Sequence, residues 1–383
     1  MSHRALFKTE HELFRDSFRK FVQAEIVPHH DQWEENQHVS RDLWSKAGAQ
    51  GFLCPTVPEE YGGSGVDRLF SLIIVEELSL VNCLGPGFSL HSDIVAPYLL
   101  NYGTEAQKQK YLPHMVSGSL IGAIAMTEPG TGSDLQAIKT TAVLDGEDLV
   151  IDGTKVFITN GFMSDLVVVA LQVIDPKGDD RPQLSLVIVE ATREGFSKEK
   201  PLKKMGQKAQ DTCILNFDNV RVPKENILGG VDKVGAGIGM LFGELAWERL
   251  IIAASAVAGA EFCLNEALNY TQQRQAFGQT LASFQDVRFK LADMKSKISV
   301  GRAFVDQCMS QLLEDRLSPS DAATAKYWCT EMATEVADAA VQMHGGYGYM
   351  LEYPVARAFT DLRAHRIYGG ANEIMKEIIA RSL

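Results

Sequence analysis

The spacing of hydrophobic residues changes twice along this chain, and the changes divide it into three parts. Up to about residue 120, apolar residues recur at helical spacing, for example over 13–26 and 69–78. Between about 121 and 230 they form short β-branched runs, and from about 235 an Ala- and Leu-rich helical spacing returns. We therefore expect three domains, over residues 1–120, 121–232 and 233–383.

The middle part is expected to be an antiparallel β domain. Asp145-Gly146 and Asp152-Gly153 separate its first β-branched runs. Asp-Gly between strand-like runs favours a two-residue hairpin, because both central residues of that turn need positive φ. Each pair therefore predicts a tight reversal of the chain.

The last part is expected to be a helical bundle. Helical spacing extends over 250–273, 284–313 and 319–343, with short connections between the segments. Long helices joined by short loops are typical of antiparallel bundles. The predicted fold class is α+β, with an N-terminal helical domain, a central antiparallel β domain and a C-terminal four-helix bundle.

The composition excludes some classes of partner. Lys and Arg number 37 against 49 Asp and Glu, which gives a formal net charge of −12. An acidic chain has no general attraction to nucleic-acid backbones or anionic lipid, so we expect neither as a partner. The hydrophobic content of 45% is ordinary for a soluble globular protein.

The cysteines indicate a reducing compartment. All six lie far apart with no CxxC pair, which argues against a zinc site and against a disulfide scaffold. Charges interrupt the first residues, which have neither the apolar stretch of a signal peptide nor an Arg-rich transit pattern, and no segment is expected to span a membrane. We expect a cytoplasmic protein, although a mature organellar protein has the same features.

Three common classes of motif find no support in the sequence. Gly235-Ala236-Gly237-Ile238-Gly239-Met240 lacks the last glycine of a dinucleotide-binding fingerprint and follows no buried strand, so we interpret it as a flexible entry to a helix. The P-loop, HExxH and GxSxG motifs do not occur, and the nine histidines are scattered. We therefore expect no metal site and no serine hydrolase.

A Gly- and Thr-rich loop opens the β region at residues 126–134. Its backbone N–H groups and hydroxyls suit an anion or a polar ring edge, but by itself the loop is read equally well as a plain turn. Three further segments accompany it: KVFITNG at 155–161, RQAFG at 274–278 followed by Phe284-Gln285, and QMHGGYG at 342–348. With these four motifs in order, the sequence resembles the acyl-CoA dehydrogenase family across nearly the whole chain.

The resemblance implies an FAD site in a crevice between the β domain and the bundle. It places Met126 and Thr127 at the pyrimidine side of the flavin, and Ser133, with Gly132 beside it, near the pyrophosphate. Phe157 is implied to lie on the flavin ring, where many relatives have tryptophan, and Thr159 to hydrogen-bond near the reactive N5. Alternation along the strand equally permits Phe157 as a core residue.

A second group of residues is implied to reach the FAD of a neighbouring subunit. An arginine offers paired donors to a pyrophosphate, and adjacent glycines allow close approach of the backbone. The resemblance therefore implies a homo-oligomer, for which we expect a tetramer, and it also places Ala371 and Glu373 near the flavin. The residues implied at the subunit boundary are Arg274, Phe277, Gln285, Gln342, Gly345 and Gly346.

The catalytic base requires a separate argument, because many family members carry it after the terminal tyrosine, where this chain has Gly369. Glu244 and Glu248 lie four residues apart on one helix face, and Arg249 matches a family arginine near the substrate. A subset of the family, including long-chain and isovaleryl-CoA dehydrogenases, combines a glutamate before that arginine with glycine after the tyrosine. We therefore predict Glu248 as the base, with Glu244 as a helper or an exposed charge.

Gly369 is expected to complement Glu248. Without a side chain it leaves space over the substrate's α-carbon, and its N–H remains available to the thioester oxygen as an oxyanion-hole donor. The implied substrate neighbours are Ser133, Ala246, Trp247 and Arg249, with Leu245 beside them.

The sequence thus predicts an FAD-dependent dehydrogenase of fatty or branched acyl-CoA thioesters. Glu248 removes the α-proton, hydride leaves the β-carbon for flavin N5, and an electron-transfer flavoprotein accepts the electrons. The alternatives are an acyl-CoA oxidase or flavin monooxygenase of the same fold, and a non-catalytic FAD- or acyl-CoA-binding scaffold. The acyl chain length and the choice between dimer and tetramer do not follow from the sequence.

Overall fold

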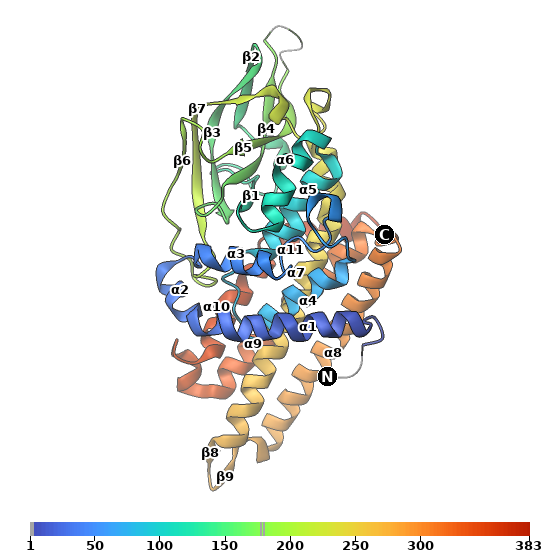
Figure 1. Ribbon diagram of the computed structural model, residues 1–383. Helices are drawn as coiled ribbons and strands as arrows, with labels where there is room; N and C mark the ends of the chain where they lie inside the picture. The colour runs from blue at the N-terminus through green and yellow to red at the C-terminus, as the bar shows by residue number, and fades with distance from the viewer. Residues whose placement is uncertain (1–3, 177, 179–180) are drawn as a thin grey trace.

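The structure is a computed structural model that describes residues 4–176, 178 and 181–383. The β domain forms one end of the molecule, the N-terminal helices cross its middle, and long C-terminal helices extend to the other end (Figure 1). The order of helices, strands and helices is the one that the hydrophobic spacing predicts.

The N-terminal part is helical. Asp67 begins one of its helices by accepting a hydrogen bond from the Leu69 backbone N–H at 2.9 Å, and Thr104 and Gln107 form a reciprocal capping box at another. Its elements are α1 (Thr9–Phe21), η1 (Val22–Ile26), η2 (Val27–His29), α2 (His30–Asn36), α3 (Arg41–Ala49), η3 (Glu59–Tyr61), α4 (Arg68–Ser79), η4 (Leu90–Val95), α5 (Ala96–Tyr102) and α6 (Glu105–Val116).

The middle part is one sheet centred on β4. This strand pairs with β5 along its length and, in turn, with β1 and β2. The strands are β1 (Gly122–Ala125), β2 (Thr141–Asp145), β3 (Asp148–Thr159), β4 (Leu166–Ile174), β5 (Gln183–Glu190), β6 (Phe196–Lys198) and β7 (Thr212–Pro223), with the short helical turns η5 (Leu135–Ala137), η6 (Lys224–Asn226) and η7 (Val231–Lys233).

The prediction of an antiparallel domain holds for most of the sheet and is wrong at β4. The pairs β2–β3, β3–β7, β4–β5 and β6–β7 are antiparallel, whereas β4 runs parallel to both β1 and β2. The long connection 126–140 carries the chain from β1 to β2 in the same direction along β4, which a tight turn cannot do. The sheet is therefore mixed.

The two Asp-Gly pairs differ in structure. The predicted hairpin at Asp145-Gly146 is confirmed, since Asp145 pairs with Asp148 and Gly146 has a φ of 69°. The predicted reversal at Asp152-Gly153 is wrong, because both residues lie inside β3, where the register with β7 shifts between Ile151 and Gly153. This is a β-bulge: β7 continues to pair with β3 on both sides of it, so the chain does not turn back.

The C-terminal part is a bundle built on three long helices. The helices α7, α8 and α9 pack on one another, and the shorter α10 and α11 pack on α9 where the prediction has a fourth long helix. The elements are α7 (Gly237–Gln273), β8 (Gln275–Ala276), β9 (Gln279–Thr280), η8 (Leu281–Ser283), α8 (Gln285–Leu313), α9 (Pro319–His344), η9 (Gly345–Tyr349), α10 (Pro354–Arg363), η10 (Ala364–Arg366) and α11 (Asn372–Ala380).

Helix α7 is longer than the sequence pattern predicts, because it already begins at Gly237, within the glycine-rich entry segment. By length and composition it is the one helix among the described residues that is apolar enough to cross a membrane, which the sequence analysis did not expect. Its most apolar window is 72% buried inside the protein, so the same apolar character serves the core of the bundle.

A buried carboxylate joins the N-terminal helices to the bundle. Glu76 on α4 forms ion pairs with three arginines: Arg4 at 2.8 Å, Arg15 of α1 at 3.2 Å and Arg302 of α8 at 2.5 Å. Burial by itself raises a carboxyl pKa, but the three guanidinium groups outweigh it and hold the pKa of Glu76 below its usual value. Its contribution to stability is therefore present above the unfolded-state pKa and is lost as the pH falls through the folded-state pKa.

Replacing Glu76 tests this junction. Glu76→Ala leaves three guanidinium groups facing one another without their shared carboxylate, so we expect a loss of about 3–5 kcal/mol in the free energy of unfolding, measured by urea denaturation at neutral pH. The exposed pair of Lys297 and Glu335, 2.6 Å apart, supplies a control, and Glu335→Ala is expected to cost less than about 1 kcal/mol. Equal losses in the two variants contradict the prediction.

Candidate functional site

Two buried carboxylates on α7 face helix α5. The Tyr98 hydroxyl donates a hydrogen bond to Glu248 Oε1 at 3.1 Å, and Asn101 Nδ2 donates to Glu244 Oε1 at 2.8 Å. Glu248 is only 5% exposed, and burial raises its pKa to about 7, with Glu244 adding to the rise while Tyr98 and Arg249 oppose it. A carboxylate with this pKa is suited to accept a proton near neutral pH.

The neighbours of Glu248 on α7 are buried as well. Glu244 is 5% exposed, so its interpretation as an exposed charge is wrong, and Arg249 is 7% exposed. Arg249 is unusual because its buried Nε has no hydrogen-bond partner among the described residues. Burial lowers the pKa of its guanidinium. A buried donor without a partner is costly, which is compatible with a ligand that supplies the acceptor.

Gly369 packs against the same helix. Ile252 lies one turn after Glu248 on α7, and a Cβ added to Gly369 would stand 2.3 Å from Ile252 Cδ1. Gly369 also has a φ of 64°, in the left-handed region that favours glycine. The structure therefore brings Gly369 and Glu248 to one face of α7. A side chain at position 369 would point at Ile252. The Ile252 side chain therefore fills at least part of the space that the absence of a side chain at 369 leaves.

A buried lysine that the sequence analysis missed holds the loop after Gly369. Lys326 on α9 is fully buried, and its Nζ donates to the Gly370 carbonyl and to Asn372 Oδ1, both at 2.8 Å. Asn372 in turn donates to Thr330 at 3.0 Å and to Glu331 at 2.8 Å. Burial, and then the nearby Arg249, lower the pKa of Lys326 to about 8. The feature of the sequence that could have indicated this buried lysine is that it is the one lysine in an alanine-rich helix, α9.

A second missed residue shapes the loop 126–134. Lys155 on β3 is fully buried and donates to Met126 O at 3.0 Å and to Glu128 Oε1 at 2.8 Å. Glu128 also accepts from the backbone N–H groups of Lys139 and Thr140 at 2.7 and 2.9 Å. Burial opposes ionisation, but these donors hold the pKa of Glu128 near 2. The ion pair thus fixes the base of the loop and leaves Gly130, Gly132 and Ser133 exposed at its tip.

Phe157 projects from the strand next to this loop. Its side chain is 66% exposed and its φ is 62°, at a shift in register between β3 and β7. The alternative that Phe157 is a core residue is therefore excluded. Left-handed backbone at a bulky residue costs free energy, and such strain collects at functional sites. Thr159 lies two residues further along β3 and is half-buried.

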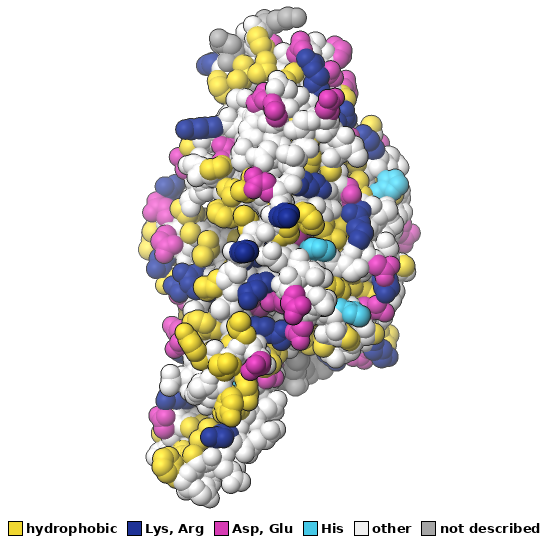
Figure 2. All heavy atoms as spheres, turned by 90° about the vertical axis from the view of Figure 1, so that its left-hand side faces the viewer, with side chains coloured by type: hydrophobic (Ala, Val, Ile, Leu, Met, Phe, Trp, Pro, Cys, Tyr) yellow, Lys and Arg dark blue, Asp and Glu magenta, His cyan; other side chains and the backbone are white. Residues whose placement is uncertain are grey.

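The residues predicted at a subunit boundary lie at the opposite end of the molecule. Arg274, Gln342, Gly345 and Gly346 line one open pocket of about 420 Å³. Phe277 is 96% exposed at the tip of the β8–β9 hairpin, and Gln285 begins α8 beside it. Figure 2 shows that hydrophobic side chains reach this projecting end of the molecule.

The length of α7 separates these residues from Glu248. At about 1.5 Å per residue, a continuous helix places Arg274 roughly 39 Å from Glu248 along the axis. Arg274 and the pocket that it lines are therefore remote from Glu248 within one chain.

The remaining predicted residues lie on α7 next to Glu248 and at the start of α11, after Gly369. Ala371 caps α11, Glu373 is exposed on its first turn, and Ala246 is half-buried on α7. Trp247 is buried in the core between α4 and α7, under the guanidinium of Arg68 at 4.9 Å from the ring centre.

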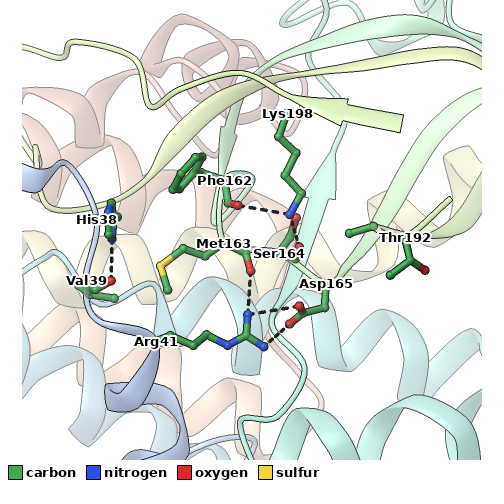
Figure 3. A pocket seen from close by; sticks show the side chains of 10 residues that line it. His38, Val39, Arg41, Phe162, Met163, Ser164, Asp165, Thr192 and Lys198 are labelled. Atoms are coloured by element: carbon green, nitrogen blue, oxygen red, sulfur yellow. Dashed lines mark hydrogen bonds and ion pairs between the residues drawn. The ribbon is translucent and has the colours of Figure 1, made fainter. Parts of the chain in front are cut away.

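Another pocket, of about 370 Å³, lies between the N-terminal helices and the sheet, and none of the predicted site residues lines it. Its polar groups bond to one another: Arg41 pairs with Asp165 at 2.5 Å, and Lys198 donates to the carbonyls of Phe162 and Ser164 (Figure 3). These internal bonds explain the charged residues without a ligand.

Known proteins resemble the chain over its whole length. Family models described as the acyl-CoA dehydrogenase N-terminal, middle and C-terminal domains match residues 8–119, 123–220 and 235–383. The long-chain specific acyl-CoA dehydrogenase of mitochondria in Mus musculus is 50% identical over 380 residues, which cover 99% of this chain and 88% of that protein.

Two solved structures are similar in fold. An acyl-CoA dehydrogenase from Geobacillus kaustophilus matches with a TM-score of 0.95 and 45% identity over 99% of both chains. An acyl-CoA dehydrogenase from Bacillus anthracis, solved with FAD, matches with a TM-score of 0.90 and 32% identity over 98% of this chain and 67% of that chain. The predicted three-part fold with a central β domain is thereby confirmed.

The glycine at position 369 can be tested directly. Gly369→Ala is expected to destabilise the fold by about 1–3 kcal/mol, because alanine is strained at this φ and its Cβ collides with Ile252. Adding Ile252→Val removes the colliding Cδ1 and should recover part of the loss in a double-mutant cycle of unfolding free energies. Gly239→Ala is the control: its Cβ would have no heavy atom within 4 Å, so this helical substitution should stabilise slightly.

Proposed function

Because the chain belongs to the acyl-CoA dehydrogenase family and carries out FAD-dependent dehydrogenation of acyl-CoA thioesters, we propose that Glu248 is its catalytic base. The observation that carries this proposal is a buried carboxylate, with a pKa raised to about 7, on the α7 face against which Gly369 packs. Glu373, the other carboxylate near the loop that follows Gly369, is exposed on α11, whereas Glu248 is buried.

The residues of the chain suit an FAD. Phe157 offers an exposed ring beside the loop 126–134, whose tip is free of internal packing. Arg274 and the adjacent glycines Gly345 and Gly346 offer a cation and an accessible backbone in one pocket. We propose that the first group holds the flavin end of the FAD of its own chain, and that the second group reaches the FAD of a neighbour. When bound, FAD supplies the acceptor for the hydride that leaves the substrate's β-carbon.

The chain's own groups divide the remaining work. The free oxygen of Glu248 takes the α-proton, and the Gly369 N–H donates to the thioester oxygen as negative charge develops there. Arg249 places a buried positive charge next to Glu248, so it favours the ionised base. Lys326 and Asn372 fix the loop that carries Gly369, so its N–H does not need to reorganise during the reaction.

Three finer points extend the proposal. The substrate is a fatty or branched acyl-CoA of β-oxidation, and a panel of short, long and branched acyl-CoAs tests its chain length.

An electron-transfer flavoprotein accepts the electrons. Rapid reaction of the reduced enzyme with oxygen would instead favour an oxidase or monooxygenase. The six cysteines, all buried and unpaired, support a reducing compartment, for which we propose the cytoplasm.

We further propose a homo-oligomer, with a tetramer as the expected form, because a second copy of the chain allows each FAD to meet both groups of residues. The roughly 39 Å between Glu248 and Arg274 along α7 prevents one chain from supplying both. The exposed Phe277, at the end of a projecting hairpin, is suited to burial against a second copy.

The role of Glu248 is tested by its removal. Glu248→Gln keeps the shape of the side chain but cannot take a proton, so FAD should remain bound while flavin reduction by an acyl-CoA falls at least about 1000-fold in anaerobic stopped flow. In the unmodified enzyme the rate of reduction should rise with pH through about 7, because the base must be ionised.

Two further variants sharpen this test. Glu335→Gln changes an exposed carboxylate on α9 and should leave reduction unchanged. Glu244→Gln separates the two buried carboxylates: if it abolishes reduction while Glu248→Gln does not, Glu244 is the base. A yellow protein that fails to bleach with every acyl-CoA tested would favour the non-catalytic scaffold.

The oligomer is tested at the hairpin. Phe277→Asp should lower both the molar mass in light scattering and the FAD content, because a charge replaces an apolar contact at the proposed boundary. Leu13→Asp is the matched control, since Leu13 is also exposed, at 67%, but lies on α1. An unchanged mass and FAD content in Phe277→Asp would contradict the proposed assembly.

A further inference from the structure

Helices α5 and α7 are joined by two matched hydrogen bonds in the buried region around the base. Tyr98 and Asn101 lie three residues apart on α5, and Glu248 and Glu244 lie four apart on α7, so each pair shares one helix face. Tyr98 Oη donates to Glu248 Oε1 at 3.1 Å, and Asn101 Nδ2 donates to Glu244 Oε1 at 2.8 Å. Each buried carboxylate thus has its own donor from α5.

The local structure before Tyr98 is itself unusual. The turn η4, from Leu90 to Val95, is a π-helix that runs directly into α5 at Ala96. Widened π turns change the angular position of all following residues relative to an α-helix, and they occur often at functional sites. In this chain the turn sets which side chains of α5 face α7.

The hydrogen bond to Tyr98 leaves Glu248 with one free oxygen. Among the described residues, Oε1 accepts from Tyr98 and no other hydrogen bond reaches the carboxylate. Tyr98 is fully buried and packs in the core shared by the N-terminal helices and the sheet, so its ring is fixed. A fixed donor on one oxygen restricts the rotation of the carboxyl group.

We propose that Tyr98 is a positioning residue for the catalytic base: its hydroxyl holds Oε1 of Glu248 and stabilises the carboxylate, so that Oε2 stays free to take the substrate's α-proton. The inference rests on the proposed role of Glu248. It assigns to α5, in the N-terminal part of the chain, a task in a reaction whose base and N–H donor come from the C-terminal part.

Charged groups around Glu248 act on its ionisation in opposite directions, so the hydrogen bond from Tyr98 affects the balance between them. Its own helix contributes Glu244, which disfavours its ionisation, and Arg249, which favours it. Arg68 of α4 faces Glu244 and Asp93 of η4, and Lys326 of α9 faces Arg249. Against burial and the charge of Glu244, Tyr98 is the one hydrogen-bond donor in the described structure that lowers the pKa of Glu248.

The test is the pH profile of flavin reduction in Tyr98→Phe, which keeps the ring and removes the donor. We expect the rising limb of the profile to move to higher pH by about one unit, with the rate on the acid side about tenfold lower and KM little changed. At high pH, where the base is ionised again, most of the rate should return. An unmoved limb, with or without a uniform loss of rate, would overturn the proposal.

A control and a second probe keep the test decisive. Tyr111 donates to Glu190 at 2.6 Å in another, partly buried Tyr–Glu pair, away from α7, so Tyr111→Phe should leave the limb in place. If Tyr98→Phe does not fold, 3,5-difluorotyrosine at position 98 keeps the shape and is a stronger donor. It should move the limb to lower pH, and a limb that stays in place or moves upward would overturn the proposal.

The outcome is separable from that of the proposed function. If Glu248→Gln still reduces its flavin, the assignment of the base fails. If Glu248→Gln is inactive and Tyr98→Phe has the profile of the unmodified enzyme, only the positioning role fails.

Discussion

The rest of the structure depends on the continuous, buried helix α7. It runs from the edge of the sheet to the far end of the bundle without a break, so the positions of its side chains are set relative to both ends of the molecule. Glu248 is buried on this helix with a hydrogen-bond donor from α5, and Gly369 packs one turn further along against Ile252. The same length places Arg274 far from Glu248, which supports the proposal that a second chain completes the FAD site.

Buried charges with defined partners hold the site together. Glu76 connects α4 to α1 and α8, Lys155 and Glu128 fix the loop beside Phe157, and Lys326 fixes the loop after Gly369. A buried charge is tolerated only where its hydrogen bonds are met, so each of these networks permits one arrangement of its segment. Arg249 differs from these three groups, because its Nε has no partner in the described structure, and it lies next to the proposed base.

The sequence predicted the parts better than their contacts. Helical spacing located α8 and α9 to within one residue at each end, and Asp145-Gly146 marked a true hairpin. Asp152-Gly153 gave a wrong prediction of a hairpin, because the same dipeptide that reverses a chain can form a bulge when a long partner strand continues past it. The parallel pairing of β4 was also missed, since the direction of a strand depends on a connection that periodicity does not describe. Lys155 and Lys326 read as ordinary lysines because their acceptors are far away in the chain.

By itself, the sequence determined the order of the three parts and the family resemblance, and it predicted the pairing of Glu248 with the glycine at 369. These follow from local spacing and from motifs that remain visible in one dimension. Only the tertiary structure decided that Glu244 is buried, that Tyr98 donates to Glu248, and that Ile252 occupies the space beside Gly369. Burial and hydrogen bonding set the pKa of a carboxylate, and both arise from residues that are distant in sequence and adjacent in space.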